Sequence, residues 1–267
     1  SQLGTIPRQI EGTQFGSIQA WIGPPEFLTG VDSRYEVLSV PGVFKDAVHF
    51  TRTFQDPEFS AAFLAVGANR GLKGLGIWIS GPLTLNMRTP VNRLADLDGR
   101  KIRVLASPMQ NEQMRLLKAT AVPMSLGEVM PALQQGAIDG LLASVPVLTA
   151  MRFYGAAKHI YESDFSMAAS IAVFNKAWFD KLPPDLQKLV ADTAQKTSVD
   201  INTWSLAFIV SQRAAWIKAG GEITKPTEAE RAQMMKAMGP IGAEITARKP
   251  EEKAMFELMM KAAKRTE

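Results

Sequence analysis

The chain of 267 residues contains no cysteine. This absence excludes disulfide bonds, thiolate zinc sites and cysteine nucleophiles. Its only histidines are His49 and His159, and we expect both to be partly exposed side chains of amphipathic helical segments rather than metal ligands. The sequence therefore predicts a protein without a metal site or a cofactor.

Long apolar runs are also missing. The most apolar stretch, residues 204–210, is far shorter than the roughly 18 uncharged residues that a membrane-spanning helix needs. The first residues show no basic segment followed by an apolar one, as a secretory leader would. We therefore expect a soluble protein without direct membrane insertion, with any export signal removed or never present.

Charge of one sign is not concentrated in any large segment. The net charge is +4, and lysines and arginines alternate with acidic residues along the chain. The one basic cluster, Lys261, Lys264 and Arg265, lies near the C-terminus without aromatic neighbours that could stack on bases. We expect no nucleic-acid partner, although a mild positive field would help to guide a small anion to the protein.

The common catalytic motifs are absent as well. The sequence contains no Gly-x-Ser-x-Gly elbow, no phosphate-binding loop and no His-Glu-x-x-His. Gly71, Gly74 and Gly76 precede a predicted strand, whereas a dinucleotide fingerprint follows a strand and opens a helix. We therefore do not expect an enzyme, and an enzyme with an unusual site is the least favoured of the functions considered.

Short β-like apolar runs alternate with longer helical ones, which is typical of an α/β protein. Two lobes suit a chain of this length in which nearly half of the residues are apolar. The longest helical pattern follows Pro183-Pro184 and ends at Gly220-Gly221. A helix of roughly 35 residues would be about 50 Å long, so we expect it to span both lobes, with Ile201, Trp204 and Phe208 on its apolar face. We predict strands at residues 17–22, 76–79, 101–105 and 137–142.

Residues 99–140 carry the clearest local signals. Arg103 lies near the carboxyl end of the predicted strand 101–105. Ser107, followed by a proline, predicts an N-cap and the first turn of a helix. Ser125 and Glu128 match a capping box at the start of the next helix.

Three segments in this region, residues 96–104, 122–125 and 132–140, resemble in sequence and order the substrate-binding proteins of tripartite ATP-independent periplasmic (TRAP) transporters. The similarity extends through residues 175–178 and 182–189 and back to 1–4 and 16–18, so it covers essentially the whole chain. Members of this family normally have a strand-helix-strand unit before the Gln-Leu-Gly motif, with which this chain begins. We therefore expect part of the first lobe to be missing.

The resemblance implies a two-lobed periplasmic-binding-protein-like fold with a long helix spanning both lobes. It also implies a cleft that closes on a carboxylate ligand, which is then delivered to membrane permease subunits of a TRAP transporter, and a periplasmic location. We assign residues 1–85 plus 169–208 to lobe I, which would be incomplete at its N-terminal side, and residues 86–168 plus 209–267 to lobe II. A ligand-binding sensory domain of a membrane receptor is the alternative function.

In the family, the arginine of the Lys-Ile-Arg-Val strand binds the carboxylate, and here it is Arg103. A guanidinium suits this role because its planar fork of donors matches both carboxylate oxygens. An ordinary surface salt bridge is the alternative for Arg103. Pro24 stands where a glutamate can follow the first strand in the family, and Ala143 stands where many members have asparagine.

The remaining candidate contacts to the ligand are Trp78, Ser80, Ser107, Leu126, Ala143, Ser144, Phe165 and Met167. Core packing is the alternative for the larger apolar side chains among them. Because the substitutions at family pocket positions are toward apolar residues, buried ligand hydroxyls would lack partners. We therefore expect a monocarboxylate with an apolar or aromatic body.

Overall fold

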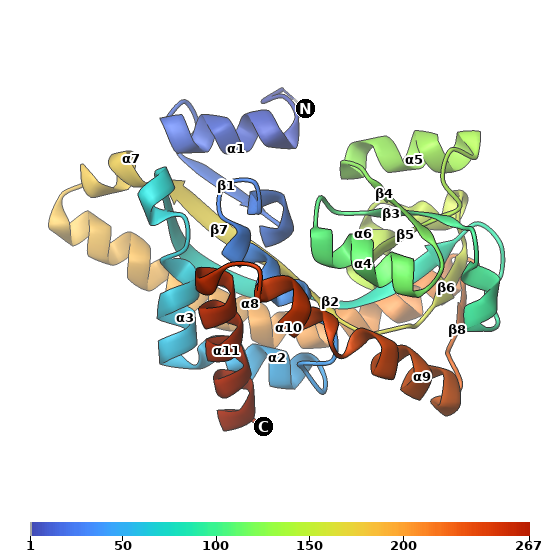
Figure 1. The fold of residues 1–267 in the computed structure, drawn as a ribbon. Helices are drawn as coiled ribbons and strands as arrows, with labels where there is room; N and C mark the ends of the chain where they lie inside the picture. Colours follow the sequence, from blue (N-terminus) through green and yellow to red (C-terminus); the bar gives the residue numbers. More distant parts are fainter. Residues whose placement is uncertain (1) are drawn as a thin grey trace.

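The computed structural model describes residues 2–267, and Ser1, the first residue of the motif at 1–4, lies outside them. The molecule is a mixed α/β structure of two lobes (Figure 1), which confirms the predicted fold class. The strands are β1 (Ala20–Gly23), β2 (Leu72–Met87), β3 (Lys101–Val104), β4 (Thr120–Pro123), β5 (Gly140–Ser144), β6 (His159–Tyr161), β7 (Met167–Asn175) and β8 (Glu222–Thr224).

The helices lie before or between these strands, and the last three follow β8. They are α1 (Ile6–Phe15), α2 (Ala47–Gln55), α3 (Pro57–Leu64), α4 (Pro108–Leu116), α5 (Leu126–Gln135), α6 (Val145–Ala150), α7 (Lys176–Asp180), α8 (Pro184–Lys218), α9 (Glu228–Met238), α10 (Ile241–Thr246) and α11 (Pro250–Arg265). Two 3-10 turns, η1 (Pro25–Leu28) and η2 (Ser33–Ser39), follow β1.

Within residues 2–267 the strands form one eight-stranded sheet in the order β1-β7-β2-β5-β3-β4, with β6 paired to β2 and β8 paired to β6. The antiparallel strands β2 and β7 run from one lobe into the other (Figure 1). Their register shifts between Gly74 and Gly76 and again between Ile79 and Gly81. Strand β2 has 16 residues and is far longer than the strand predicted at 76–79. The prediction was too short because apolar side chains on both faces hide the alternation that marks a half-buried strand.

Helix α8 crosses both lobes, as predicted, and is 35 residues long (Figure 1). The predicted apolar face is confirmed only in part: Ile201, Trp204 and Phe208 line one groove together, but Trp204, which stacks on Phe208, is 57% exposed. The buried positions of α8 include Asn202, whose side-chain oxygen accepts a hydrogen bond of 2.9 Å from the amide of Ile79. Small and polar side chains face β2 because the helix packs closely on the backbone of that strand, which has glycine at position 76.

The interpretation of the two histidines was right only in part, since His49 is helical but not exposed and His159 is partly exposed but not helical. His49 lies on α2 but is buried, and its Nε2 is 2.8 Å from the backbone oxygen of Ala263. His159 lies in strand β6 and its Nδ1 is 3.1 Å from a carboxylate oxygen of Glu222. Both rings therefore hold neighbouring elements together.

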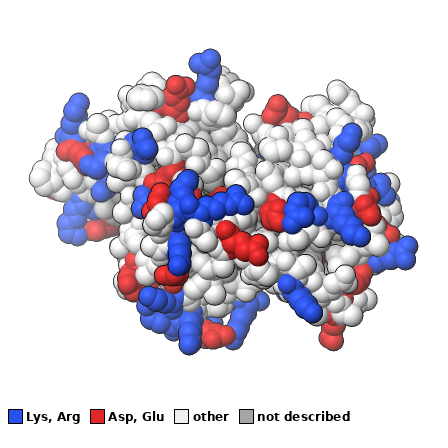
Figure 2. Space-filling model, in the orientation of Figure 1, with Lys and Arg blue, Asp and Glu red and all other residues white. Residues whose placement is uncertain are grey.

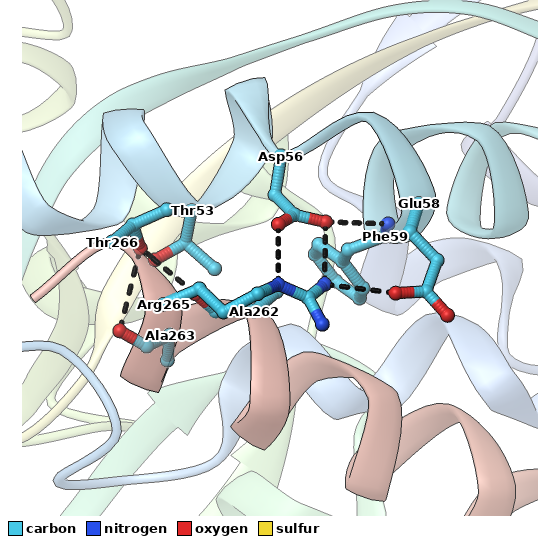
Figure 3. Close-up of polar contacts among 8 residues, drawn as sticks. All are labelled: Thr53, Asp56, Glu58, Phe59, Ala262, Ala263, Arg265 and Thr266. Atoms are coloured by element: carbon cyan, nitrogen blue, oxygen red, sulfur yellow. Dashed lines mark hydrogen bonds and ion pairs between the residues drawn. The ribbon is translucent and has the colours of Figure 1, made fainter.

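Helix α11 packs against α2 and α3, in the lobe that also carries α1 and β1 (Figure 1). Arg265, near its end, binds Asp56 and Glu58 (Figure 3). Residues 250–265 thus contact elements assigned to lobe I, although the predicted boundaries place them in lobe II, and that division stays a prediction. Among the described residues, no helix is long and apolar enough to cross a membrane.

Candidate functional site

Arg103 lies on β3, between two parallel neighbours, opposite Val122 of β4 and Leu141 of β5. As predicted, it is next to the last residue of its strand. Leu141 and Val122 belong to the smaller of the two apolar clusters, whereas Ile102 and Val104 belong to the larger one. The strand therefore presents Arg103 to the face of the sheet that α5 and α6 cover, and only 2% of the residue is exposed.

The guanidinium of Arg103 has one protein partner within residues 2–267. Its Nε donates a hydrogen bond of 2.9 Å to the backbone oxygen of Met124. No carboxylate of the described chain lies within 4.0 Å of it, and its two terminal nitrogens have no protein acceptor. Arg103 is thus a buried cation with a free donor fork rather than half of a surface ion pair.

The charge of Arg103 is weakly balanced by its surroundings. Burial lowers the pKa of its guanidinium to about 10, and the carboxylates of Glu128 and Glu26 act in the opposite direction. The group is still cationic at neutral pH. A buried charge without a close counter-ion is costly, so an anion that enters this region would be strongly favoured.

Glu26 is the functional candidate that the sequence analysis missed. It lies in the turn η1, directly after β1, and is 1% exposed. The hydroxyl of Ser39 donates a hydrogen bond of 2.7 Å to its carboxyl oxygen. Burial raises the pKa of Glu26 to about 7, and the nearby carboxyl of Glu36 adds to this, while Arg103 acts against it. The available signal was a glutamate in an apolar run just after a predicted strand, two positions beyond Pro24, where the family can have a glutamate.

Ser107 is engaged by the protein on both sides. Its hydroxyl accepts from the amide of Gln110 at 3.1 Å, as predicted for the N-cap of α4, and donates to Glu36 at 2.8 Å. Glu36 also accepts a hydrogen bond from the amide of Met109. In this structure the pair therefore joins η2 to the start of α4, and the hydroxyl of Ser107 has no proton left to donate to a ligand.

Leu126 and Ala143 lie on the same side of the sheet as Arg103. Ala143 is two residues beyond Leu141 on β5, so the two side chains share a face. Leu126 is the first residue of α5 and packs against the same cluster. The structure therefore brings these two apolar candidates and the cation to one wall, near the carboxyl ends of β3 and β5.

Trp78 and Ser80 lie in a different place. They line a groove of about 150 Å³ between β2 and α8, together with Trp204 and Phe208. The hydroxyl of Ser80 is 3.1 Å from that of Ser170 on the neighbouring strand. Arg103 is not among the residues that line this groove.

Phe165, Met167 and Ser144 are all buried. The two apolar side chains belong to the larger core cluster, and the backbone oxygen of Phe165 accepts a hydrogen bond of 2.9 Å from Gly42. Ser144 begins the turn into α6, and its hydroxyl has no hydrogen-bond partner among the described residues. Core packing accounts for Phe165 and Met167, and Ser144 keeps a donor without a protein acceptor.

The surface is hollowed between the lobe that carries α1 and the lobe that carries α5 (Figure 2). Basic and acidic side chains are mixed over the face shown, without a large region of one sign (Figure 2). The two carboxylates that act on Arg103 come from opposite sides of this division, Glu26 from η1 and Glu128 from α5. Arg103 therefore lies where the two lobes meet.

Two curated relatives are 30% identical to the chain over most of its length. The 2,3-diketo-L-gulonate-binding periplasmic protein of Escherichia coli is 30% identical over 197 residues, which cover 73% of this chain and 60% of that protein. An uncharacterized protein of Haemophilus influenzae is 30% identical over 217 residues, which cover 79% of this chain and 66% of the relative. The matched regions thus span 60 to 66% of the length of these relatives.

Solved structures of TRAP periplasmic solute-binding proteins have the same two-lobed fold. The protein from Xanthobacter autotrophicus, with bound β-D-galacturonate, is 31% identical and superposes with a TM-score of 0.89 over 97% of this chain and 86% of that one. The protein from Desulfovibrio salexigens, with bound orotic acid, is 26% identical, with a TM-score of 0.93 over 100% of this chain and 86% of that one. The family model of the bacterial extracellular solute-binding proteins, family 7, matches residues 1–249. The chain therefore belongs to this family, as the resemblance of its sequence to TRAP substrate-binding proteins implied.

Proposed function

We propose that the protein captures a small organic acid in the periplasm and delivers it to the permease subunits of a TRAP transporter. The observation that carries this proposal is the state of Arg103, which is 2% exposed and has no carboxylate partner within 4.0 Å in residues 2–267. A planar guanidinium can hold both oxygens of a carboxylate in two parallel hydrogen bonds. An acid bound in this way would supply the counter-ion that the folded chain lacks.

The names of the relatives support an acid as ligand and transport as the role. One relative is named for binding 2,3-diketo-L-gulonate, and two were solved with bound β-D-galacturonate and bound orotic acid. Each of these molecules carries a carboxyl group, and other relatives are named for C4-dicarboxylates. The same names describe periplasmic binding proteins, which favours a transport role over the sensory domain of a receptor.

The finer part of the proposal is that the acid is a monocarboxylate with an apolar or aromatic body. Leu126 and Ala143 support it, because they line the wall beside Arg103 with groups that cannot satisfy buried hydroxyls. The relatives do not decide between ligand bodies, since galacturonate is rich in hydroxyls and orotic acid is a planar ring with polar N–H and carbonyl groups. The preference for an apolar body therefore rests on Leu126 and Ala143 beside Arg103.

Titration calorimetry with a panel of acids tests both parts. The panel contains benzoate, orotate, pentanoate and galacturonate, with a sugar and an amine that lack a carboxyl group. We expect micromolar or tighter binding of at least one acid, and recovery of that acid unchanged after incubation. Arg103→Gln should weaken binding by about thirtyfold or more, because removing one partner of a buried charge pair costs about 2 to 5 kcal/mol.

Arg115→Gln is the matched control, because Arg115 is exposed on α4 and pairs only with Glu112. This variant should bind like the parent. Binding of the sugar or the amine alone, or equal affinity in the Arg103 variant, would contradict the proposal. Tighter binding of galacturonate than of every other acid would contradict only the apolar body.

A further inference from the structure

We propose that Glu26 is a specificity-determining residue that accepts a hydrogen bond from a donor on the body of the ligand, while Arg103 holds the carboxylate at the other end. This inference rests on the proposed function and narrows the ligand class to acids that carry a hydroxyl or an N–H group away from the carboxylate. A plain hydrocarbon acid would leave Glu26 without a ligand partner.

The position of Glu26 follows from the geometry of η1. In a 3-10 turn, residues three apart lie on the same face, so Glu26 and Thr29 face the same way. The hydroxyl of Thr29 is 3.1 Å from the backbone oxygen of Ala106, which comes two residues after the end of β3. The face of η1 that carries Glu26 therefore lies against the end of the strand that carries Arg103.

The carboxyl of Glu26 has spare capacity to accept hydrogen bonds. Within residues 2–267, Ser39 is the only side chain that donates to it. The backbone of Glu26 itself is a second hydrogen-bond partner of this carboxyl. A carboxyl group has about four acceptor positions when ionised and keeps acceptor capacity when protonated, so these two partners leave room for a further donor. A buried glutamate with this capacity and 1% exposure is costly unless a further donor is supplied.

Glu26 and Arg103 act on each other without forming an ion pair. Each alters the pKa of the other, yet no oxygen of Glu26 lies within 4.0 Å of a guanidinium nitrogen. Two buried groups of opposite charge would normally approach until they touch, because contact offsets their loss of hydration. A small ligand with an acceptor end and a donor end would satisfy both groups, whereas an acid without a donor would satisfy only Arg103.

Calorimetry with matched ligands tests the inference. One series is benzoate with its meta-hydroxy and para-hydroxy derivatives, and the other is pentanoate with its terminal hydroxy derivative. We expect the parent to prefer a hydroxylated member over its hydrocarbon counterpart by about tenfold to a hundredfold, which is the range for a hydrogen bond to a charged group. Glu26→Leu should remove this preference, and Glu26→Gln, whose side-chain oxygen still accepts, should keep part of it.

The ratio of affinities is the readout, because a purely structural role for Glu26 would weaken both members of a pair equally. Glu11→Leu, at an exposed position of α1, is the matched control and should keep the ratio of the parent. If both members of each pair bind equally and still require Arg103, the inference is wrong and the proposed function stands. If the ratio is unchanged in Glu26→Leu, the inference is also wrong. If no acid binds at all, both fail.

Discussion

Arg265 holds both carboxylate oxygens of Asp56, through Nε and one terminal nitrogen, at 2.9 Å each (Figure 3). Asp56 is also the N-cap of α3, since it accepts a hydrogen bond of 3.0 Å from the amide of Phe59. The interaction therefore fastens the end of α11 to the start of a helix more than two hundred residues earlier. The guanidinium of Arg265 lowers the pKa of the Asp56 carboxyl.

We predict that Arg265→Gln lowers the melting temperature by about 2 to 4 °C, a shift typical of a modest loss in a chain of this size, and that the loss shrinks in high salt. Asp56→Ala should cost more, because it also removes a helix cap worth about 1 kcal/mol. Thermal unfolding followed by circular dichroism measures both. Equal melting temperatures for Asp56→Ala and the parent would show that this contact adds nothing to stability.

The buried carboxyl of Glu26 predicts a pH-dependent stability. Burial raises its pKa from 4.5 to about 7, with Glu36 adding to the rise and Arg103 opposing it. Between these two values the folded chain binds the proton more tightly than the unfolded chain does, so the free energy of unfolding falls as the pH rises through this window. The change levels off above about pH 7 and amounts to no more than on the order of 3 kcal/mol.

Glu26→Gln should remove this contribution and become more stable relative to the parent as the pH increases from 4.5 to 8. Urea unfolding of both proteins at a series of pH values gives the difference between their free energies of unfolding. Glu11→Gln serves as the control and should follow the parent at every pH. A difference that stays constant over this range would contradict the assignment of a raised pKa to Glu26.

Gly140 begins β5 at a point where the neighbouring strand comes very close. A methyl group there would lie 2.5 Å from the backbone oxygen of Asn86 and against the sulfur of Met87. We predict that Gly140→Ala destabilises the protein by about 2 kcal/mol, since such overpacking forces backbone shifts. Gly127→Ala, in the first turn of α5 with no atom near the added methyl group, should be neutral or slightly stabilising. Similar unfolding midpoints for the two variants in urea would be the contrary result.

Local signals in the sequence were reliable guides to helix starts. The capping box of Ser125 and Glu128 begins α5, and Ser107 caps α4, as predicted. The length of α8 and its passage across both lobes were also predicted. These features depend on neighbouring residues, which is why the sequence reveals them without a structure.

The candidate site was harder to predict because it depends on contacts between distant segments. Arg103 could be placed near the end of its strand, but the free donor fork is visible only in the folded chain. Trp78 and Ser80 have the residue types of a ligand pocket, yet β2 turns them toward α8. The burial of Glu26 could not be predicted, because it depends on contacts with other segments. Ser39 belongs to the separate turn η2, and the end of β3 is far from η1 along the chain.

The most direct test of the account is a crystal structure of the protein with the tightest-binding acid of the calorimetric panel. We predict that the carboxylate of the ligand lies about 2.7 to 2.9 Å from nitrogens of the Arg103 guanidinium, the distance typical of such charge-assisted bonds, with the lobes closed over it. A ligand bound elsewhere, or an Arg103 side chain paired with a carboxylate of the protein in that complex, would contradict the account.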